Sequence, residues 1–92
     1  MIESFRHKGL QRLYEDDDRR KLPADMADRI RRILAALDAA MTIEALNQPT
    51  LRLHPLKGDL KGFWAVTVRA NWRIVFRFEG GKIFDVDLID YH

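Results

Sequence analysis

The sequence predicts an α+β fold, with two helices in the first half of the chain and an antiparallel sheet in the second half. Apolar residues recur with helical spacing over residues 7–41, and they alternate with polar residues between residues 51 and 89. Helices followed by a run of hairpin-connected strands are typical of this class. We therefore expect two N-terminal helices packed on one face of a small, mainly antiparallel sheet, within a single domain spanning residues 1–92.

The first helix is expected over residues 7–15, after a short opening strand in "MIESF". Leu10, Leu13 and Tyr14 follow the spacing of an amphipathic helix, and His7 is interpreted as one of its surface residues. The charged stretch "EDDDRRKLP" then breaks the pattern. Its three consecutive aspartates are interpreted as a solvated loop rather than a metal site, because adjacent side chains on an irregular link do not converge.

The second helix is expected to begin near Pro23 and Asp25, because proline suits the first turn of a helix and an acid suits the positive end of its dipole. One more short turn is expected in "TIEALNQP". The helix carries a single apolar stripe, which is interpreted as core rather than as a binding face. The stripe contains Met26, Ile30, Ile33, Leu34, Leu37 and Met41.

Four stretches after Pro49 alternate apolar and polar residues as half-buried strands do. They are "TLRLHP", "GFWAVTVR", "NWRIVFRF" and "KIFDVDLI", with turn residues at Asn71 and in "EGGK". Two helices packed on one sheet face would leave the other face free. The residues expected to face the helices are Trp64, Val66, Val68, Trp72, Ile74, Phe76, Phe78, Phe84, Val86 and Leu88, with Asp85 and Asp87 facing outward.

Positive charge is concentrated in the strand region. Residues 52–82 hold seven Lys/Arg and two acids, whereas residues 1–51 hold nine of each. By alternation, Arg73 and Arg77 point away from the core, where two guanidinium groups with Lys57 nearby would suit neighbouring phosphates. A basic, solvated sheet face that keeps the protein soluble is the alternative, and charge alone leaves both interpretations open.

Composition limits the class of protein further. The apolar share of 47% is typical of a folded chain, and no apolar run approaches the roughly 20 residues of a membrane span. Cysteine is absent, which excludes disulfides and thiolate metal sites, and the opening residues lack the apolar core of a signal peptide. We therefore expect a cytoplasmic protein with no membrane partner.

The three histidines, His7, His54 and His92, favour acid–base chemistry over metal binding, since no two of them have the spacing of a metal site. No metal and no cofactor is expected. A histidine, with an unperturbed pKa of about 6.5, can both accept and donate a proton near neutrality. Cleavage of an RNA backbone needs two such transfers, one from the 2′-OH and one to the departing 5′ oxygen, while cations offset the charge of the phosphorane.

The tail residues Asp90, Tyr91 and His92 are ambiguous from spacing alone. In an unbroken strand, Asp90 and His92 share a face with Leu88, and that face is the covered one. For the tail to serve a site on the other face, the strand has to end or twist near Ile89. A frayed polar tail and a catalytic tail are both consistent with this pattern.

These segments together resemble a known family. The opening "MIESFRHKGLQRLYE", the segment "RLHPLKGDLKGFWAVTVRANWRIVFRF" and the final "DYH" are similar to the signature of HigB toxins, of the RelE/ParE superfamily of type II toxin–antitoxin systems. The similarity covers essentially the whole chain. It implies a RelE-like fold of the microbial ribonuclease type. It also implies an endoribonuclease that cuts messenger RNA in the 30S A site without a metal, leaving a 2′,3′-cyclic phosphate.

The resemblance also implies roles for individual residues. His92 is expected to be the principal proton-transfer residue and His54 its counterpart, while Asp90 holds an imidazole and Tyr91 stacks on or hydrogen-bonds the nucleotide. Of the substrate-binding residues, Lys57 and Arg73 match phosphate-contacting positions of the family, and Asn71 lies in the matching turn. Arg77 is added to them from strand alternation. The expected catalytic residues are His54, Asp90, Tyr91 and His92, and the expected substrate-binding residues are Lys57, Asn71, Arg73 and Arg77.

The implied partners are messenger RNA on the ribosome and a helix-turn-helix antitoxin of the HigA type, with operator DNA bound only through the antitoxin. One alternative is a ParE-like toxin that inhibits gyrase and shares the fold without nuclease chemistry. The presence of both His54 and His92 argues against it. A second alternative is a decayed toxin that binds RNA or antitoxin without catalysis.

Overall fold

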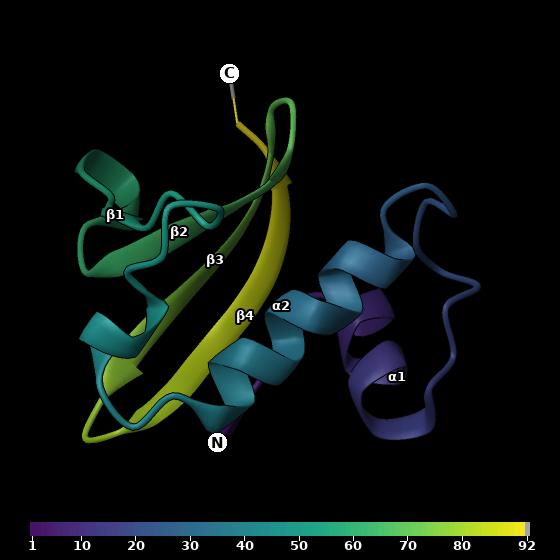
Figure 1. Ribbon diagram of the computed structural model, residues 1–92, viewed down its shortest axis with the longest axis horizontal. Coiled ribbons are helices and arrows are strands. Elements are labelled where there is room, and N and C mark those ends of the chain that lie inside the picture. Colours follow the sequence, from purple (N-terminus) through teal and green to yellow (C-terminus); the bar gives the residue numbers. More distant parts are fainter. Residues whose placement is uncertain (92) are drawn as a thin grey trace.

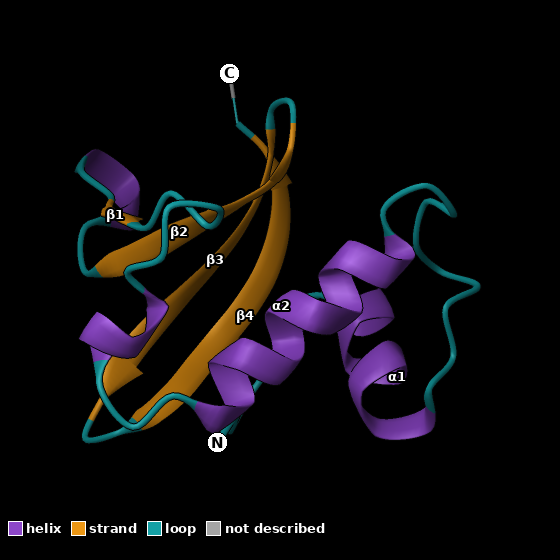
Figure 2. Ribbon diagram, in the orientation of Figure 1, coloured by secondary structure: helices purple, strands orange, loops and turns teal. Residues whose placement is uncertain are grey.

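The second half of the chain forms one four-stranded antiparallel sheet, whose strands pair in chain order. In the computed structural model, which describes residues 1–91, two helices lie against this sheet (Figures 1 and 2). This arrangement confirms the predicted α+β class. The elements are α1 (Lys8–Asp16), α2 (Ala27–Ala39), the 3-10 helix η1 (Ile43–Leu46), β1 (His54–Pro55), the 3-10 helix η2 (Gly58–Leu60), β2 (Phe63–Arg69), β3 (Trp72–Glu79) and β4 (Lys82–Asp90).

The opening segment runs along the outer edge of β4. Ile2 forms a parallel bridge with Ile83, and Phe5 forms another with Val86. The predicted opening strand is therefore present only as two isolated bridges, and they make the sheet mainly rather than wholly antiparallel. None of the helices in residues 1–91 has the length and apolar content that a membrane span requires.

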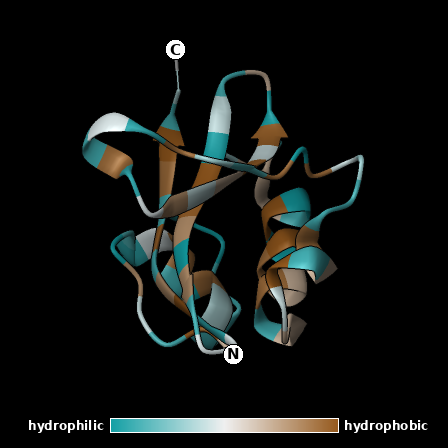
Figure 3. Ribbon diagram, turned by 90° about the vertical axis from the view of Figure 1, so that its left-hand side faces the viewer, coloured by the Kyte–Doolittle hydropathy of each residue, from teal (hydrophilic) through white to brown (hydrophobic). Residues whose placement is uncertain are grey.

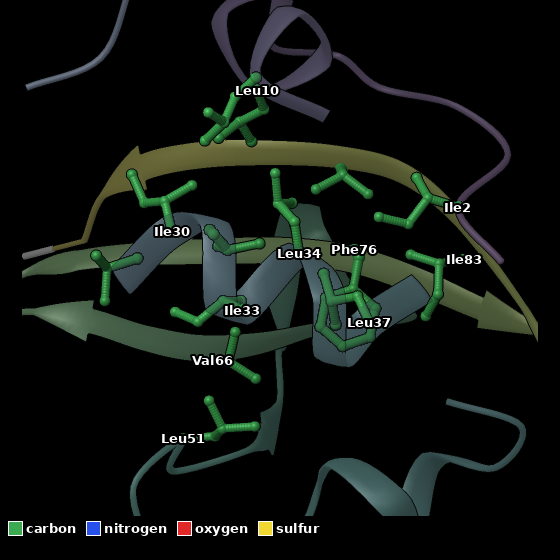
Figure 4. Close-up of a cluster of buried hydrophobic side chains, with 14 of the residues drawn as sticks. Ile2, Leu10, Ile30, Ile33, Leu34, Leu37, Leu51, Val66, Phe76 and Ile83 are labelled. Carbon is green, nitrogen blue, oxygen red and sulfur yellow. The ribbon is translucent and has the colours of Figure 1, made fainter. Parts of the chain in front are cut away.

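The core lies between α2 and the covered face of the sheet (Figure 4). Ile30 and Leu37 of α2 are fully buried, as are Val66, Ile74 and Phe76 of the strands. Burial of one such side chain contributes about 1.5–3 kcal/mol. These contacts confirm the core stripe of the second helix and the inward-facing positions of the second and third strands. They also show that α2 covers one face of the sheet, so that only the opposite face is available to bind a ligand.

The ends of α2 differ from the prediction. Residues 23–26 form a turn, closed by a hydrogen bond of 3.1 Å from the Met26 N–H to the Pro23 carbonyl, so the helix begins only at Ala27. It ends at Ala39 because Ala40 takes an extended conformation with ψ 124°. Met41 therefore lies beyond the helix with 78% of its surface exposed, and its predicted place in the core is wrong.

The start of α1 depends on His7. Its ring Nδ1 accepts a hydrogen bond of 3.2 Å from the Leu10 N–H, which makes His7 the N-cap residue rather than a surface residue of the helix. Gly9 packs against the same ring, and a Cβ atom at Gly9 would come within 2.8 Å of the imidazole Cε1. His7 thus has a structural role at the start of α1.

One carboxylate joins α1, α2 and the opening segment. The Asp38 Oδ1 accepts hydrogen bonds from the Tyr14 hydroxyl at 2.6 Å and from the Ile2 N–H at 3.0 Å. The bond to the Asp38 carboxylate raises the pKa of Tyr14 to about 12, and the same bond lowers the pKa of Asp38. The network therefore fixes the first helix against the second.

The first predicted strand, "TLRLHP", is almost absent because Arg52 has a positive φ of 51°, which interrupts an extended chain. Only His54 and Pro55 pair regularly with β2. Arg29 of α2 holds the neighbouring backbone instead, since its Nε donates to the Val68 carbonyl at 2.7 Å and its Nη2 donates to the Thr50 carbonyl at 2.8 Å. These bonds place β1 as a short edge strand.

A β-bulge changes which residue of β4 enters the core. Asp85 has a φ of 57°, and between the pairs Val75–Asp87 and Arg77–Phe84 two residues of β4 oppose one residue of β3. Ile83 is consequently fully buried, whereas Phe84 is only half-buried and lies on the other face. The prediction that Phe84 faces the helices is therefore wrong, because alternation fails across a bulge.

Candidate active site on the open face of the sheet

The face of the sheet opposite α2, here called the open face, carries most of the expected site residues that the structure describes. Residues directly opposed on antiparallel strands share a face, so the pairing registers place side chains in rows across it. Figure 3 shows hydrophilic and hydrophobic residues mixed along the strands. The first row holds Thr67, Arg73 and Ile89, the second His54, Ala65, Val75 and Asp87, and the third Phe63, Arg77 and Phe84.

The loop after β1 folds back over one corner of the open face. Leu56 and Leu60 pack there against Phe63, Ala65 and Val75, which form a second, smaller apolar cluster. The expectation of a free face is therefore wrong at this corner and holds only for the remainder of the sheet. Lys57 lies in this loop directly before η2, and its side chain is exposed. The loop thus brings an ammonium group to the margin of the face.

His54 lies in the second row at the edge of the sheet, where it pairs with Ala65. Its Nδ1 is 3.1 Å from the Arg52 carbonyl oxygen. A carbonyl oxygen can only accept a hydrogen bond, so the proton of a neutral imidazole lies on Nδ1 and the lone pair lies on Nε2. The half-buried ring is therefore oriented with Nε2 able to accept a proton.

Arg73 lies in the first row, on β3, which is separated from β1 by β2. Its Nη1 donates to the Ala70 carbonyl at 2.6 Å and to the Trp72 carbonyl at 3.2 Å. Its Nε is buried and has no hydrogen-bond partner in the described part of the chain. None of the carboxylates in residues 1–91 forms an ion pair with this guanidinium, so its positive charge remains available to an anion.

The last described residues lie against the turn between β2 and β3. β4 continues through Asp90, which pairs with Trp72, and the Tyr91 N–H donates to the Asn71 carbonyl at 2.7 Å. The strand therefore ends one residue after Ile89, near the position that a catalytic tail requires. Asp90 and Tyr91 are both exposed. The expected role of His92 concerns a residue outside the described range.

Arg77, in the third row, is held by acids. Its Nε donates to the Asp85 Oδ2 at 2.8 Å and its Nη1 donates to the Glu79 Oε1 at 2.7 Å. The guanidinium carbon also lies 5.3 Å from the centroid of the Phe84 ring. The hydrogen bond to Asp85 raises the pKa of Arg77. Unlike Arg73, this residue already has its charge compensated.

The structure brings the candidates into two groups with Arg73 between them. His54 and Lys57 lie at the β1 edge, and Asn71 and Tyr91 lie at the β2–β3 turn. His54 and Arg73 are two strands apart and one row apart, which is about 12 Å between backbones at the usual strand spacing and rise per residue. Both side chains can therefore reach a common phosphate between them.

Sequence reasoning missed one residue of this face. Arg6, which precedes α1, places its guanidinium carbon 4.9 Å from the centroid of the Phe63 ring. No motif or period in the opening segment signals this contact, since it depends on how that segment lies beside β4.

A separate cavity of about 300 Å³ lies between α1 and α2, away from the open face. Its lining includes Leu13, Tyr14 and Arg31.

Comparisons with known proteins identify the family of this chain. A family model described as the RelE-like toxin of the type II toxin–antitoxin system HigB matches residues 3–92. The chain belongs to the HigB family. It is 49% identical to Endoribonuclease HigB of Proteus vulgaris over the full length of both proteins. It is also 35% identical over 83 residues to Toxin HigB-1 of Vibrio cholerae serotype O1, covering 88% of this chain and 87% of the relative.

These matches confirm the family resemblance drawn from the sequence and support the endoribonuclease class of the HigB chain. Solved structures support the fold alone, because their sequences have diverged. A YafQ mutant from E. coli superposes with a TM-score of 0.63 at 15% identity, covering 96% of this chain and 89% of YafQ. A YoeB–YefM complex from Staphylococcus aureus gives 0.62 at 17% identity, covering 100% of this chain and 95% of the matched chain.

Proposed function

We propose that this HigB-family toxin is an endoribonuclease that cuts messenger RNA in the ribosomal A site, in the cytoplasm, and that the open face carries the reaction. The observation that supports this most directly is that His54 and Arg73 lie in adjacent rows of the same sheet face. A proton acceptor and an uncompensated guanidinium within reach of one phosphate are the groups that transfer of an RNA phosphodiester needs.

The proposed reaction needs no metal. His54 Nε2 removes the proton from the 2′-OH, and the 2′ oxygen attacks the adjacent phosphorus. The bond from phosphorus to the 5′ oxygen then breaks, and a general acid protonates that oxygen, which leaves a 2′,3′-cyclic phosphate. The hydrogen bond between the His54 Nδ1 and the Arg52 carbonyl favours the base role for His54, because it leaves Nε2 unprotonated in the neutral ring. Each such transfer contributes about 10²–10⁴-fold.

The acid role falls to His92, with Asp90 orienting it, on the strength of the family signature in the sequence. Tyr91 contacts the nucleotide, and Asn71 supports Tyr91 through the hydrogen bond between their backbones. These assignments make the end of β4 the second half of the site, opposite His54.

Arg73 and Lys57 supply the positive charge that stabilises the phosphorane. Arg73 is supported by its anchoring to two backbone carbonyls, which fixes the guanidinium without neutralising it. Arg77 is proposed to stabilise the bulge of β4 rather than the substrate, because two carboxylates already hold it.

Dependence on the ribosome is supported by the separation of the two halves of the site. His54 and the β2–β3 turn lie on different strands, and neither half alone encloses a nucleotide. A messenger RNA held in a bent conformation by the ribosome would bring the scissile phosphate to both halves at once, which lowers the entropic cost of reaction. Free RNA is then a poor substrate.

An antitoxin is the second proposed partner, because the family is defined by toxin–antitoxin systems. We propose a helix-turn-helix protein of the HigA type, which neutralises the toxin and through which alone the toxin reaches operator DNA. The solved YoeB–YefM heterotetramer is a toxin–antitoxin complex of a protein with the same fold.

Primer extension on messenger RNA after induction of the toxin tests the proposed activity. Breaks within codons are expected for the wild-type chain, and their loss is expected for His54→Gln and for His92→Gln. Intact messenger RNA accompanied by trapped DNA breaks would instead indicate a gyrase inhibitor. Growth arrest that is unchanged in both variants would indicate a protein that acts by binding alone.

Incubation of purified toxin with RNA, with and without ribosomes, tests the dependence on the ribosome. Cleavage is expected only when ribosomes present the message. Rapid turnover of free RNA would contradict that part of the proposal while leaving the endoribonuclease activity intact.

A further inference from the structure

Arg6 places a positive charge over Phe63, in the third row of the open face. Its backbone lies beside β4, since the Arg6 N–H donates to the Val86 carbonyl at 2.8 Å. Its guanidinium, however, stacks on Phe63 of β2, with 4.9 Å between the guanidinium carbon and the ring centroid. β3 lies between β2 and β4 in the sheet. The side chain therefore extends across the open face toward the row next to His54.

This cation differs from Arg77, its neighbour on the same face. Arg6 is exposed, and within residues 1–91 it forms no ion pair with a carboxylate. The contact with Phe63 holds the guanidinium without using its N–H groups as hydrogen-bond donors, because a cation is attracted to the face of an aromatic ring. The donors at the edge of the guanidinium thus remain available for an anion.

The position of Arg6 relative to His54 suggests which anion. Phe63 lies two residues along β2 from Ala65, the partner of His54, and two residues of strand cover about 6.7 Å. Arg6 is therefore about one row from the proposed base, on the side opposite Arg73. A phosphate bound there is not the one that reacts but a neighbour along the same RNA strand.

We propose that Arg6, stacked on Phe63, binds a backbone phosphate of the messenger RNA next to the one that is cut. The inference rests on the proposed function and adds a substrate-binding residue to it. Planar guanidinium groups bind phosphate through two parallel hydrogen bonds. The aromatic platform holds the side chain before the RNA arrives, which reduces the ordering cost of binding.

The test compares three variants of the full chain. Arg6→Gln removes the charge, and Arg6→Lys retains it. Arg32→Gln is the matched control, because Arg32 is an exposed arginine of α2, outside the open face, and has no ion pair within the described residues. Toxin binding is measured on ribosomes that carry a message with a 2′-O-methyl group at the attacked nucleotide, which prevents cleavage.

Arg6→Gln is expected to weaken this binding about five- to tenfold, since hydrogen bonds to charged groups are among the stronger ones. The plot of log affinity against log salt concentration should become shallower by about 0.7, the value for one phosphate of single-stranded nucleic acid. Arg6→Lys should retain the wild-type salt slope, and Arg32→Gln should match the wild type in both measurements.

A parallel measurement on ribosomes without a message separates the two sources of phosphate. Wild type and Arg6→Gln are expected to bind these ribosomes equally. An equal loss on both kinds of ribosome would assign the phosphate to ribosomal RNA and overturn the proposal. Affinity and salt slope unchanged in Arg6→Gln, with a lowered melting temperature, would also overturn it, because Arg6 would then only cover Phe63.

Failure of the proposed function gives a different result. If the wild-type chain does not cleave an unmodified message on the ribosome, the endoribonuclease proposal fails, and the role of Arg6 fails with it. If the wild type cleaves while Arg6→Gln behaves as Arg32→Gln does, only the role of Arg6 is overturned.

Discussion

Arg73 and Arg77 lie on one strand, point to one face and belong to the same basic segment of the sequence, yet their surroundings are opposite. The Arg73 guanidinium is anchored by the backbone carbonyls of the turn at Ala70 and has no carboxylate partner in residues 1–91. The Arg77 guanidinium is bound by Asp85 and Glu79. Of the two arginines of β3, Arg73 therefore presents its positive charge, whereas the charge of Arg77 is compensated by acids.

The difference arises from two acids that bind Arg77 and not Arg73. On β4, the bulge at Asp85 turns a carboxylate toward Arg77, and the Asp85 N–H is held in place by the Ser4 hydroxyl at 2.9 Å. On β3 itself, Glu79 lies two residues beyond Arg77 and binds the same guanidinium. Within residues 1–91 no acid forms an ion pair with Arg73, which is opposed on β4 by Ile89. An arginine on this face is thus available for a phosphate only where neither its own strand nor the neighbouring strand supplies an acid that binds it.

The largest expected effect is the loss of cleavage in Arg73→Ala. Removing a positioned group that stabilises developing charge costs about 10²–10³-fold in rate. Arg77→Ala, its matched control on the same strand and face, should change cleavage by less than about threefold, as expected for a screened ion pair. Single-turnover cleavage of messenger RNA on ribosomes measures both. Equal losses in the two variants would mean that the ion pairs of Arg77 open when substrate binds.

The next effect is on stability and concerns the bulge. Asp85→Ala should lower the free energy of unfolding by about 1–2 kcal/mol, because alanine is strained at positive φ and cannot accept the bond from Arg77. Asp85→Asn should cost less, since asparagine tolerates this conformation. Urea unfolding measures both values. Cleavage rates of the folded variants should stay at the wild-type level, and a rate that falls with stability would place the bulge in the active site.

Much of the fold could be predicted because its periodic segments are long. The stripe of α2, from Ile30 to Leu37, and the alternation of β2 and β3 around Val66 and Phe76 each repeat often enough to identify a buried face. The first helix was placed within one residue at each end, over Lys8–Asp16 rather than residues 7–15. Periodicity succeeds where one packing surface continues over several turns or pleats.

The errors occur where a single residue interrupts the period. The positive φ of Arg52 shortens the first strand, and the positive φ of Asp85 exchanges Ile83 for Phe84 in the core. Neither residue is a glycine, so neither is a sequence signal for the left-handed conformation. The hydrogen bond of His7 and the end of α2 before Met41 are likewise local geometry that periodicity does not contain.

The candidate site was predictable in part for the same reason. Alternation correctly places Arg73 and Arg77 on the face away from the helices, but it does not show which acids bind them, and Asp85 reaches Arg77 only through the bulge of β4. Arg6 is absent from any sequence-based set because its contact with Phe63 joins the segment beside β4 to β2, with β3 between them. Charge compensation and contacts between distant segments require the structure.

The smallest expected effect tests whether the acids bound to Arg77 are the whole difference between Arg77 and Arg73. Glu79→Gln removes one of the two carboxylates bound to Arg77 and keeps the shape of the side chain. If the two carboxylates are what keeps the charge of Arg77 from the RNA, affinity for ribosomes carrying the uncleavable message should rise about twofold at low salt. The gain should vanish as salt screens the exposed charge.

Glu44→Gln is the control, because Glu44 is an exposed glutamate of η1, and the change removes the same charge away from the open face. It should leave affinity unchanged. A gain of equal size in both variants would trace the effect to net charge rather than to Arg77. No gain in Glu79→Gln would mean that Asp85 alone keeps this guanidinium from the RNA, because its hydrogen bond to Nε remains in place.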